Sequence, residues 1–428
     1  MTPAPVRVGL LGCGNVGAAL VELVRGRADD IATRTGLHID ITKVAVRSTT
    51  KERGVELPEG VLTHDAAGLV VDPEIDVVVE VIGGIEPARE LILSAMKAGK
   101  PVVTANKELI ANVGAELFAA AEEAGVDLLF EAAVCGAIPL IRPLRESLAG
   151  EEIRRVMGIV NGTTNYILTR MTEAGVPYAD ALAEAQSLGY AERDPTADVE
   201  GFDAAAKAAI IASIAFGVRV VAGDVYNEGI SGITQVDVAY AAKMGYVLKL
   251  LAVAERKDGA LGVRVHPAMV PVSHPLAAVR DSFNAVFVEG DAVGELMFYG
   301  RGAGGFPTAS AVLGDLVDAS VNRHKGSHAS IGALGKARIR PIDQVETAYY
   351  LNLDVVDEPG VLAAVAGVFG EHGVSIRSME QEGLGGEARL VFITHIAREA
   401  AVQATLRDLH HLDAVDRITS VLRVIGTD

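Results

Sequence analysis

Cysteine and long apolar runs are both scarce in this sequence. Its two cysteines, Cys13 and Cys135, have no Cys-x-x-Cys spacing, so neither a disulfide framework nor a cysteine-based zinc site is predicted. No apolar run reaches the roughly 18 residues needed to span a bilayer. The opening MTPAPVRVGLLG lacks a charged segment followed by a cleavable apolar one. We therefore expect a cytoplasmic protein with no membrane partner.

Positive charge is also in deficit. The chain has 38 Lys and Arg against 56 Asp and Glu, which gives a net charge of −18. Because it also lacks a Lys/Arg-rich tract, it would repel a phosphate backbone, and nucleic acid is not an expected partner. Apolar residues, in contrast, make up 50% of the 428 residues. This length is too great for one ordinary core, so two or three domains are expected.

Short runs rich in β-branched residues alternate with amphipathic helical stretches over residues 6–131. Such alternation is typical of a parallel sheet covered by helices. From about residue 135 the helical stretches become longer and strand-like pieces lie between them, which indicates a separate α+β domain. The β-rich runs of the first region are VRVGLLG, HIDITKVAV, DVVVEVI, PVVTAN and VDLLFEA.

The region from residue 347 onward reads strand, helix, strand, strand, helix, strand, with a DEPG turn before its first helix. This βαββαβ order predicts a ferredoxin-like unit. The segment before it has weak periodicity and several glycines, so we interpret it as a linker. The predicted domains are 1–134, with the helical segment 306–330 packing back on it, then 135–305, the linker 331–346, and 347–428.

The motif Gly12-Cys13-Gly14-Asn15-Val16-Gly17 directly follows the strand-like VRVGLL and precedes the helical AALVELVRG. This context favours a dinucleotide-binding turn of the Rossmann type over an ordinary glycine-rich turn, which is the alternative. Gly12 would permit the tight turn, Gly14 would let a pyrophosphate approach, and Gly17 would allow close packing of helix on strand. The N–H groups at the start of the helix, at Asn15 and Val16, would receive the phosphates.

The end of the second predicted strand bears on which cofactor binds. An NAD-preferring fold usually has Asp or Glu there, to accept a hydrogen bond from the ribose 2′-hydroxyl. Here the strand ends in Arg47, whose planar fork could hold a 2′-phosphate, with Lys51 as a second cation. We therefore predict NADP(H) as the cofactor, with NAD(H) as the alternative if Arg47 is only a solvated residue at a strand end.

Two lysines stand in surroundings that are unusual for lysine. Lys207 lies four residues after Asp203 in GFDAAAKAAIIASIAFG, which is otherwise almost wholly apolar. The two form either a helix ion pair or a lysine–carboxylate pair that delivers a proton to a developing alkoxide. Lys107 follows PVVTAN, at the sheet edge where ligands of open α/β sheets bind, unless it is a common surface lysine. Glu192 and Asp194 lie on a polar loop and could meet a substrate ammonium group or be solvated.

The order and spacing of several blocks resemble homoserine dehydrogenase from about residue 5 to 335. The most specific are the NGTTNYI block and the E-x-DP-x3-DVEG-x-D-x3-K block, since a generic dinucleotide-binding protein requires neither. The remaining segment, with Asp357-Glu358-Pro359-Gly360-Val361-Leu362, resembles an ACT domain and places the chain with the monofunctional, ACT-bearing form of that enzyme. The full set of blocks is LLGCGNVG, TANKELI, FEAAVCGAIPLI, VNGTTNYILT and LGYAERDPTADVEGFDAAAKAAI.

The resemblance implies reversible reduction of L-aspartate 4-semialdehyde to L-homoserine by NAD(P)H, in threonine, methionine and isoleucine biosynthesis. Lys207 corresponds to the proton donor to the aldehyde oxygen. Lys107 corresponds to a second lysine near the nicotinamide and the substrate. Glu192 matches a substrate-binding glutamate, and Asp203 an aspartate that positions the substrate or its proton-transfer partner.

The same resemblance implies further neighbours of the bound groups. Thr104 and the loop Gly300–Gly304, with Gly302 in it, are expected beside the cofactor. A monovalent cation, usually sodium in this family, would be held by backbone carbonyl oxygens. The alternative is a bend supported by Gly136 and Pro139. The carbonyls implied as cation ligands are those of Glu131, Val134, Gly136 and Ile138.

The resemblance also implies partners. ACT domains commonly bind a small amino acid where two of them pair, and threonine, the pathway end product, is the expected effector. The alternative is that this domain only aids assembly into the homodimer or homotetramer that we expect. Two rival functions are a 2-hydroxyacid dehydrogenase with an ACT domain and a nicotinamide- and amino-acid-sensing regulator without catalysis. The first would carry its glycine turn later in the chain, and the second leaves the two lysines unexplained.

Overall fold

The computed structural model describes residues 4–383, 385 and 387–426 and divides into two compact units. The first unit combines the chain up to Val156 with 206–225 and 284–337, and the second combines 157–205, 226–283 and the chain from Arg338 onward. The domain boundaries predicted from the sequence stay predictions. In the described part of the chain, no helix has both the length and the apolar character that crossing a membrane requires.

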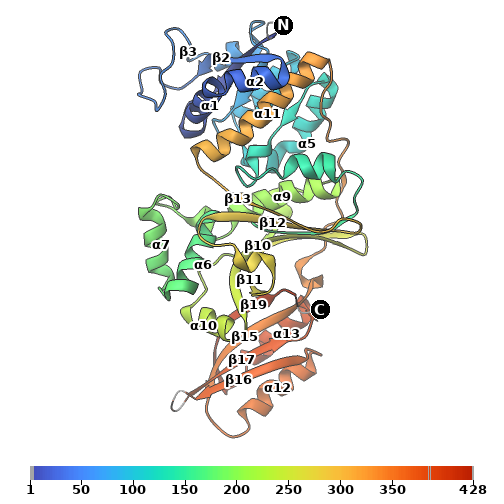
Figure 1. The fold of residues 1–428 in the computed structure, drawn as a ribbon. Coiled ribbons are helices and arrows are strands. Elements are labelled where there is room, and N and C mark those ends of the chain that lie inside the picture. The colour runs from blue at the N-terminus through green and yellow to red at the C-terminus, as the bar shows by residue number, and fades with distance from the viewer. Residues whose placement is uncertain (1–3, 384, 386, 427–428) are drawn as a thin grey trace. The chain divides into compact units, whose positions relative to one another are not determined.

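The first unit is built on a six-stranded parallel sheet, as predicted (Figure 1). The strand order is β3-β2-β1-β4-β5-β6, so the direction of winding reverses between β1 and β4. In open sheets of this kind, ligands bind outside the carboxyl ends of the strands at such a reversal. The strands are β1 (Ala4–Leu11), β2 (Leu37–Ala45), β3 (Leu62–Thr63), β4 (Val77–Glu80), β5 (Val102–Thr104) and β6 (Leu128–Leu129).

Helices cover this sheet, and one of them comes from far along the chain. Helix α11 packs along α1, and its Val312 and Leu316 share a core with Val8, Leu10 and Leu20 of the sheet and α1 (Figure 1). This helix therefore completes the apolar layer on its side of the sheet. The helices of this unit are α1 (Asn15–Gly26), α2 (Ala28–Thr35), α3 (Ala66–Val71), α4 (Ala88–Lys97), α5 (Lys107–Ala124) and α11 (Gly305–Lys325).

Four further strands lie almost wholly in the first unit, and two other elements are divided between the two units. Strands β12 (Phe283–Gly290) and β13 (Gly294–Arg301) are sheet neighbours. Two short strands, β8 (Val218–Arg219) and β14 (Gly335–Lys336), pair in parallel, so the predicted linker contributes a strand. Strand β7 (Ile153–Ile159) and helix α9 (Phe202–Phe216) each begin in one unit and end in the other.

The second unit contains a long antiparallel hairpin that the sequence analysis did not name. Strands β10 (Tyr246–Lys257) and β11 (Ala260–Pro271) pair along their whole length. Asp258 and Gly259 connect them with φ of +53° and +70°. Positive φ at both central residues suits a two-residue hairpin turn whose twist matches the strands, and Asp-Gly is a preferred pair there.

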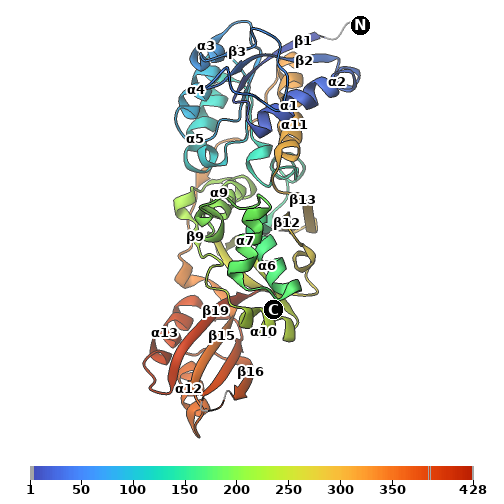
Figure 2. The ribbon, with the colours of Figure 1, turned by 90° about the vertical axis from the view of Figure 1, so that its left-hand side faces the viewer.

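The region from Glu346 has the predicted βαββαβ order. Its sheet runs β19-β15-β17-β16, and α12 and α13 cover one face of it (Figure 2). Tyr349, Leu351 and Leu353 of β15 point toward these helices and form the core with them. The elements are β15 (Glu346–Val356), α12 (Val361–Glu371), β16 (Ile376–Gly383), β17 (Glu387–Thr394), β18 (Ala397–Arg398), α13 (Glu399–Leu409) and β19 (Val415–Val424).

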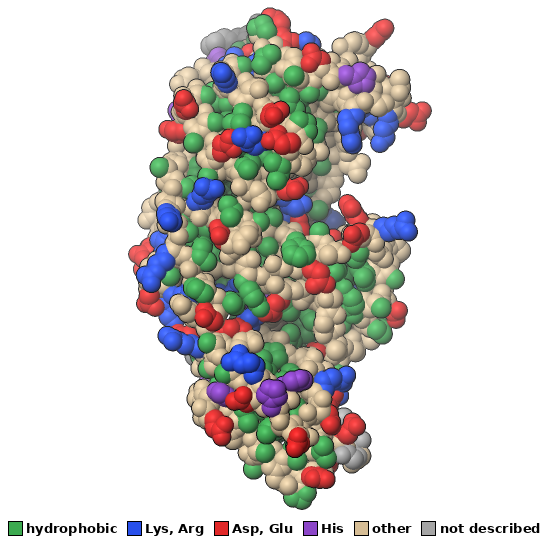
Figure 3. Space-filling view, turned by 180° about the vertical axis from the view of Figure 1, so that it is seen from behind, with side chains coloured by type: hydrophobic (Ala, Val, Ile, Leu, Met, Phe, Trp, Pro, Cys, Tyr) green, Lys and Arg blue, Asp and Glu red, His purple; other side chains and the backbone are tan. Residues whose placement is uncertain are grey.

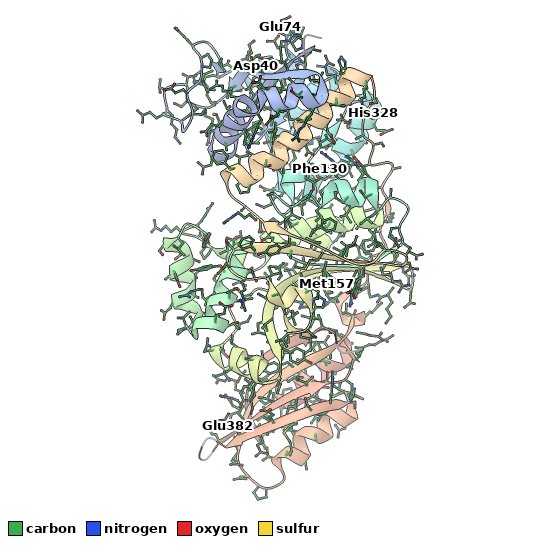
Figure 4. All side chains as sticks on the ribbon, in the orientation of Figure 1. Asp40, Glu74, Phe130, Met157, His328 and Glu382 are labelled. Carbon is green, nitrogen blue, oxygen red and sulfur yellow. The ribbon has the colours of Figure 1, made fainter. Side chains whose placement is uncertain are left out.

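The other face of this sheet contacts α10 (Gln235–Lys243). Asp237 of α10 is buried and accepts hydrogen bonds from Tyr350 Oη at 3.1 Å and Ser420 Oγ at 2.7 Å. Tyr240 Oη donates to Glu382 of β16, which Figure 4 labels. β19 also pairs in parallel with β11. The remaining elements of the unit are α6 (Gly162–Ala174), α7 (Tyr178–Ser187), α8 (Thr196–Val199) and β9 (Tyr226–Asn227).

Candidate active site

The glycine turn between β1 and α1 has the backbone geometry expected of a phosphate-binding turn. Gly12 has φ +98°, in the left-handed region that favours glycine. A Cβ at Gly17 would overlap the carbonyl oxygen of Gly12, so helix and strand approach as closely as they can. Gly14 has nothing within 4 Å of such an added atom, so its backbone is open to a ligand. The start of α1 at Asn15 therefore offers N–H groups and a positive dipole end.

A cavity of about 890 Å³ lies against this turn. Its lining includes Gly12 and Gly14 of the turn together with Arg47, Lys51 and Arg53. A neighbouring cavity of about 440 Å³ also contacts Gly14, Lys51 and Arg53. Basic side chains and a histidine gather over the segment between β2 and β3 in Figure 3, while elsewhere on that face acidic and basic side chains are interspersed. The structure thus brings Arg47 and Lys51 together at one cavity.

Sequence reasoning missed Arg53, the most fixed cation of this group. Its guanidinium donates to the carbonyl oxygens of Lys51 at 2.6 Å and of Ser48. These contacts hold the segment 48–53 in a loop, with the arginine at the cavity wall. His64, whose Nδ1 lies 3.1 Å from Val46 O, lines the same cavity. Three basic residues within seven positions, directly after the second strand, were the signal available in the sequence.

At the carboxyl ends of β4 and β5, a buried carboxylate arranges the polar residues around Lys107. Glu80 accepts from the N–H groups of Ile82 and Gly83 at 2.7 and 3.0 Å and from Thr104 Oγ1 at 2.6 Å. Ile82 and Gly83 line the larger cavity. Thr104 is therefore fixed by Glu80 rather than free to turn. A charged residue at the end of the apolar run DVVVEVI could have indicated Glu80 from the sequence.

Lys107 is the first residue of α5, which Asn106 caps. The Asn106 side chain accepts from Leu109 N at 3.1 Å and donates to Gly84 O at 2.6 Å. Both contacts are local to the sheet edge, so they fix the direction in which α5 leaves β5. The position of the Lys107 backbone is consequently set by a capped helix start, as sites built on rigid elements require.

The predicted cation ligands lie together at the turn after β6. A 3-10 turn at Glu131–Ala133 (η1) leads into Cys135 and Gly136, which both have left-handed φ of +55° and +54°. A Cβ at Gly136 would overlap the carbonyl oxygen of Gly302, so the backbone of Gly136 lies directly against Gly302. Glu131 O accepts from Val134 N at 3.3 Å, whereas no backbone N–H of the described residues donates to the carbonyl oxygens of Val134, Gly136 or Ile138. Carbonyl oxygens are ligands that suit a hard cation, and of the four the Glu131 carbonyl is already engaged by Val134 N.

The Glu131 side chain binds backbone N–H groups of the following segment. Its carboxylate accepts from the N–H groups of Leu140, Ile141 and Arg142, so it caps the segment that follows the turn. Asp315 of α11 accepts from Glu131 N at 2.8 Å and from Arg142 Nη2 at 2.9 Å. Burial raises the pKa of the Asp315 carboxyl to about 7. The geometry of the turn is therefore fixed through both its backbone and its side chains.

In the second unit, Asn161 joins two of the predicted substrate-block carboxylates. Its amide donates to Asp198 Oδ1 at 2.7 Å and to Asp203 Oδ2 at 2.9 Å, and its carbonyl caps α6 through Thr164 N at 2.9 Å. Asp203 lies in the first turn of α9, and Lys207 lies one turn later on the same helix. The NGTTNYI block thus holds the aspartate of the second specific block.

Glu192 is exposed on the loop between α7 and α8. The Gln186 side-chain amide donates to the backbone oxygen of Glu192 at 3.0 Å, which fixes the loop. The Glu192 carboxylate takes no part in this hydrogen bond. Asp194, in contrast, accepts from Thr196 N and Thr196 Oγ1 at 3.1 and 2.7 Å, and these bonds lower its pKa. Of the two loop carboxylates, Asp194 is therefore engaged by its own loop, through Thr196.

Three family models match successive parts of the chain. Residues 12–131 match the NAD-binding domain of homoserine dehydrogenase, 139–317 match homoserine dehydrogenase, and 349–413 match the ACT domain. Together they cover most of the sequence in the order predicted from its motifs. The first match supports a nicotinamide cofactor for the domain that contains the glycine turn. The ACT match supports an amino acid as the class of effector for the C-terminal domain.

Whole-chain relatives agree. The homoserine dehydrogenase of Mycobacterium tuberculosis is 52% identical over 435 aligned positions, covering 99% of this chain and 98% of the relative. That of Corynebacterium glutamicum is also 52% identical, covering 98% and 95%. A crystal structure of a homoserine dehydrogenase from Thiobacillus denitrificans superposes with a TM-score of 0.94 at 43% identity, covering 99% of both chains. A hyperthermophilic archaeal homoserine dehydrogenase in complex with NADPH gives 0.62 at 28% identity, covering 74% of this chain and 98% of that one.

Proposed function

Because this chain belongs to the homoserine dehydrogenase family, we propose that it reduces L-aspartate 4-semialdehyde to L-homoserine with NADPH in preference to NADH. Family membership makes it an oxidoreductase with a nicotinamide cofactor and a C-terminal ACT domain. The cofactor preference and the residue roles below are the proposed part. The reaction would serve threonine, methionine and isoleucine biosynthesis.

The single observation that carries the cofactor preference is the cavity wall formed by Arg47, Lys51 and Arg53. A ribose 2′-phosphate carries about two negative charges, which a planar guanidinium and an ammonium can neutralise. In the residues that line the cavity, only Glu86 carries a negative charge. A carboxylate just after the second strand would favour the 2′-hydroxyl of NADH, and Arg47 stands there instead, two residues beyond the end of β2 at Ala45.

The proposed chemistry divides the work between the cofactor and the chain. The bound nicotinamide would supply the hydride. Lys207 donates a proton to the aldehyde oxygen as negative charge develops on it, and Asp203, one helical turn earlier, positions the substrate or this lysine. Glu192 binds the substrate ammonium, and Lys107 stabilises charge near the nicotinamide. Thr104 and Gly302 would line the cofactor.

The proposed cation is sodium, bound by the carbonyl oxygens of Glu131, Val134, Gly136 and Ile138. Its role would be structural, because the backbone of Gly136 lies directly against Gly302, the expected cofactor neighbour. Sodium would hold the turn and the Gly302 loop in register. We expect the melting temperature to rise in NaCl relative to choline chloride at equal ionic strength, and an equal melting temperature would remove the cation from the proposal.

The first test is NADPH oxidation by the purified chain with L-aspartate 4-semialdehyde, compared with NADH. We expect kcat/KM to be at least about tenfold higher with NADPH, since each 1.4 kcal/mol of phosphate interaction is a factor of ten. The double variant Arg47→Ala, Lys51→Ala should reduce that ratio to near one, with Lys97→Ala on α4 as the control. A native preference for NADH would overturn the proposed cofactor but leave the reaction intact.

Lys207→Ala tests the proton donor. General acid catalysis typically contributes 10²- to 10⁴-fold, so kcat should fall by about that factor while the cofactor dissociation constant stays unchanged. Lys243→Ala, on the exposed end of α10, is a matched control that should keep full turnover. Wild-type kcat in the Lys207→Ala variant would remove this lysine from the mechanism.

Threonine is the proposed effector of the ACT domain, acting where two such domains pair in a homodimer or homotetramer. Gly360, with φ +94° before α12, leaves room for a small amino acid whose carboxylate would face the helix start. Turnover should fall on addition of L-threonine and not of D-threonine. The Gly360→Val variant should lose this inhibition while it keeps basal turnover. Equal inhibition in both proteins would contradict the proposed effector site.

A further inference from the structure

Arg423 of β19 is held between two carboxylates from distant parts of the chain. Its Nη1 donates to both carboxylate oxygens of Glu228 at 2.9 Å each, and its Nε and Nη2 donate to Glu399 Oε2 at 3.1 and 2.8 Å. Glu399 begins α13 of the ACT domain, whereas Glu228 follows β9 in the part of the chain, residues 139–317, that matches the homoserine dehydrogenase model. Only 4% of the Arg423 side chain is exposed. The arginine is therefore a buried link between the two regions.

The surroundings keep this link charged. Tyr349 Oη donates to Glu399 Oε2 at 2.6 Å, and the ring of Tyr226 faces the guanidinium at 5.4 Å. Burial opposes ionisation of Glu399, yet the charge of Arg423 holds its pKa below the ordinary value. Buried ionic groups are a weak source of stability, because desolvation offsets most of their attraction. A role in specifying the position of one segment explains such a cluster better than stability does.

Glu228 belongs to the short segment 226–230, which forms hydrogen bonds with β11 and with residues 199–200. Glu228 N donates to Val265 O at 2.8 Å, which fixes the segment to β11. Ile230 N donates to Val199 O at 2.8 Å, and Asn227 Nδ2 donates to Glu200 O at 2.9 Å. A Cβ at Gly229 would overlap the carbonyl oxygen of Val199. The segment 226–230 and residues 199–200 therefore touch with no space between them.

Residues 199–200 lead directly into the substrate block. Gly201 follows with φ +82°, and Asp203 lies two residues later in the first turn of α9. Asn161 holds Asp198 and Asp203 from the other side. The entry of α9 is thus clamped between Asn161 and the segment 226–230. A displacement of Glu228 cannot leave this entry unchanged, since packed interiors shift between discrete arrangements.

We propose that Glu228 is a positioning residue for the substrate, held in place by Arg423 of the ACT domain and acting through residues 199–200 on Asp203. The inference rests on the proposed substrate role of Asp203. It assigns an influence on substrate affinity to a side chain of the ACT domain, by a path of hydrogen bonds and short stretches of backbone that lies within one compact unit. Loosening this path weakens homoserine binding without altering the cofactor turn.

The test measures homoserine oxidation by the full chain carrying Glu228→Gln, which keeps the side-chain shape but weakens the ionic pair. We expect KM for homoserine to rise by about fivefold or more, the lower end of typical coupling between sites, with kcat and the NADP⁺ dissociation constant changed less than twofold. Arg423→Lys should act in the same direction, because an ammonium cannot span both carboxylates as the guanidinium fork does. An unchanged KM in both variants, with wild-type melting temperatures, would overturn the proposal.

Asn227→Ala is a further variant. It keeps the proposal testable if Glu228→Gln and Arg423→Lys fail to fold because a buried charge has lost its partner. It removes the hydrogen bond to Glu200 O and leaves the ionic cluster intact. The matched control is Tyr240→Phe, which removes a different hydrogen bond to the ACT sheet, to Glu382. KM should rise in Asn227→Ala and not in Tyr240→Phe. Equal effects of the two would indicate general loosening and overturn the specific path.

Asp203→Asn separates this inference from the function on which it rests. If Glu228 acts through Asp203, Glu228→Gln should raise KM far less in the Asp203→Asn background than in the wild type. Independent effects that add in full would overturn the path while leaving both residues relevant to binding. A wild-type KM in Asp203→Asn alone would instead overturn the proposed substrate role of Asp203, whatever Glu228→Gln does.

Discussion

Gly14 and Gly17 belong to the same turn, but a methyl group would meet different surroundings at each. At Gly17 an added Cβ would overlap the carbonyl oxygen of Gly12, whereas at Gly14 it would have nothing within 4 Å. Gly14 also has an ordinary extended backbone, with φ −84°. The two positions therefore separate the packing role of a glycine from its role in ligand approach.

We expect Gly17→Ala to lower the free energy of unfolding by about 1–3 kcal/mol, because the helix must move away from the strand. Gly14→Ala should unfold like the wild type and bind NADPH more weakly, because its methyl group stands in the open cavity. Urea unfolding and fluorescence titration with NADPH measure the two effects. Weakened unfolding stability in Gly14→Ala, with unchanged NADPH affinity, would contradict this division of roles.

Lys249 is a buried lysine outside the proposed chemistry. Its ammonium donates to Asn165 Oδ1 at 3.0 Å and to Val279 O, and burial lowers its pKa to about 8. Between pH 8 and its ordinary value of 10.5, the unfolded chain binds more protons at this site, so stability rises with pH. Below pH 8 both states hold the proton and the effect is constant.

Lys249→Met removes this titration. The unfolding free energy of the wild type minus that of the variant should increase by up to about 3 kcal/mol from pH 8 to 10.5. Urea unfolding at steps across that range measures it, and comparison with the variant cancels the other groups that titrate there. Parallel pH profiles for the two proteins would show that Lys249 keeps an ordinary pKa.

At the scale of elements, Asn161 connects the start of α6 to the start of α9. Asn161→Ala removes the cap and both donations to the aspartates, so we expect a loss of about 1 kcal/mol in stability together with a higher KM for homoserine. Asn161→Asp keeps a capping acceptor and places a third carboxylate beside Asp198 and Asp203. It should retain most of the stability and still raise KM. Thermal unfolding and steady-state kinetics distinguish these outcomes, and a normal KM in both variants would refute the connection.

The elements differ in how far the sequence could predict them. The parallel sheet, α9, α11 and the βαββαβ region were predicted, because alternation, apolar periodicity and the glycine turn mark them locally. The β10–β11 hairpin was not named. The middle of β10 and all of β11 except Pro271 are buried, including Lys249, Arg264 and His266, so no alternation of apolar and polar residues indicates a strand.

The residues of the candidate site also differ in how far the sequence could predict them. Residues in recognisable blocks could be proposed from spacing, while those that hold the blocks in place could not. Glu80 contacts Thr104 across 24 positions, Asp237 contacts Ser420 across 183, and Glu228 contacts Arg423 across 195. Glu80 ends an apolar run and could have been suspected from it, whereas Asp237 and Glu228 read as ordinary polar residues in their own segments. Only the tertiary fold reveals with which distant side chain each of them is paired.

At the scale of the whole molecule, removing the ACT domain would remove more than the proposed effector site. A chain that ends at residue 345 would leave Glu228 without Arg423 and Asp237 without Tyr350, Asn352 and Ser420. The truncation also uncovers the edge of β11 that pairs with β19 at Ala268 and Met269. We expect this truncated chain to melt well below the full chain, because it loses these hydrogen bonds, each worth about 0.5–1.5 kcal/mol, and exposes an unpaired strand edge. Calorimetry of the two chains measures the difference, and an unchanged melting temperature would contradict the expected dependence.

The pairing of β19 with β11 has a consequence for synthesis. β11 can pair with β10 as soon as that hairpin leaves the ribosome, because the two strands are consecutive. Its contact with β19, at Ala268 and Met269, must wait until residues 272–424 have been translated. β9 can cover this edge at Arg264 and Val265 from the start, since it precedes β11 in the chain. The stretch at Ala268 and Met269 stays unpaired during that interval, and an unpaired edge is the kind of surface that captures other chains. The time taken to translate residues 272–424 therefore sets how long this stretch of edge stays open.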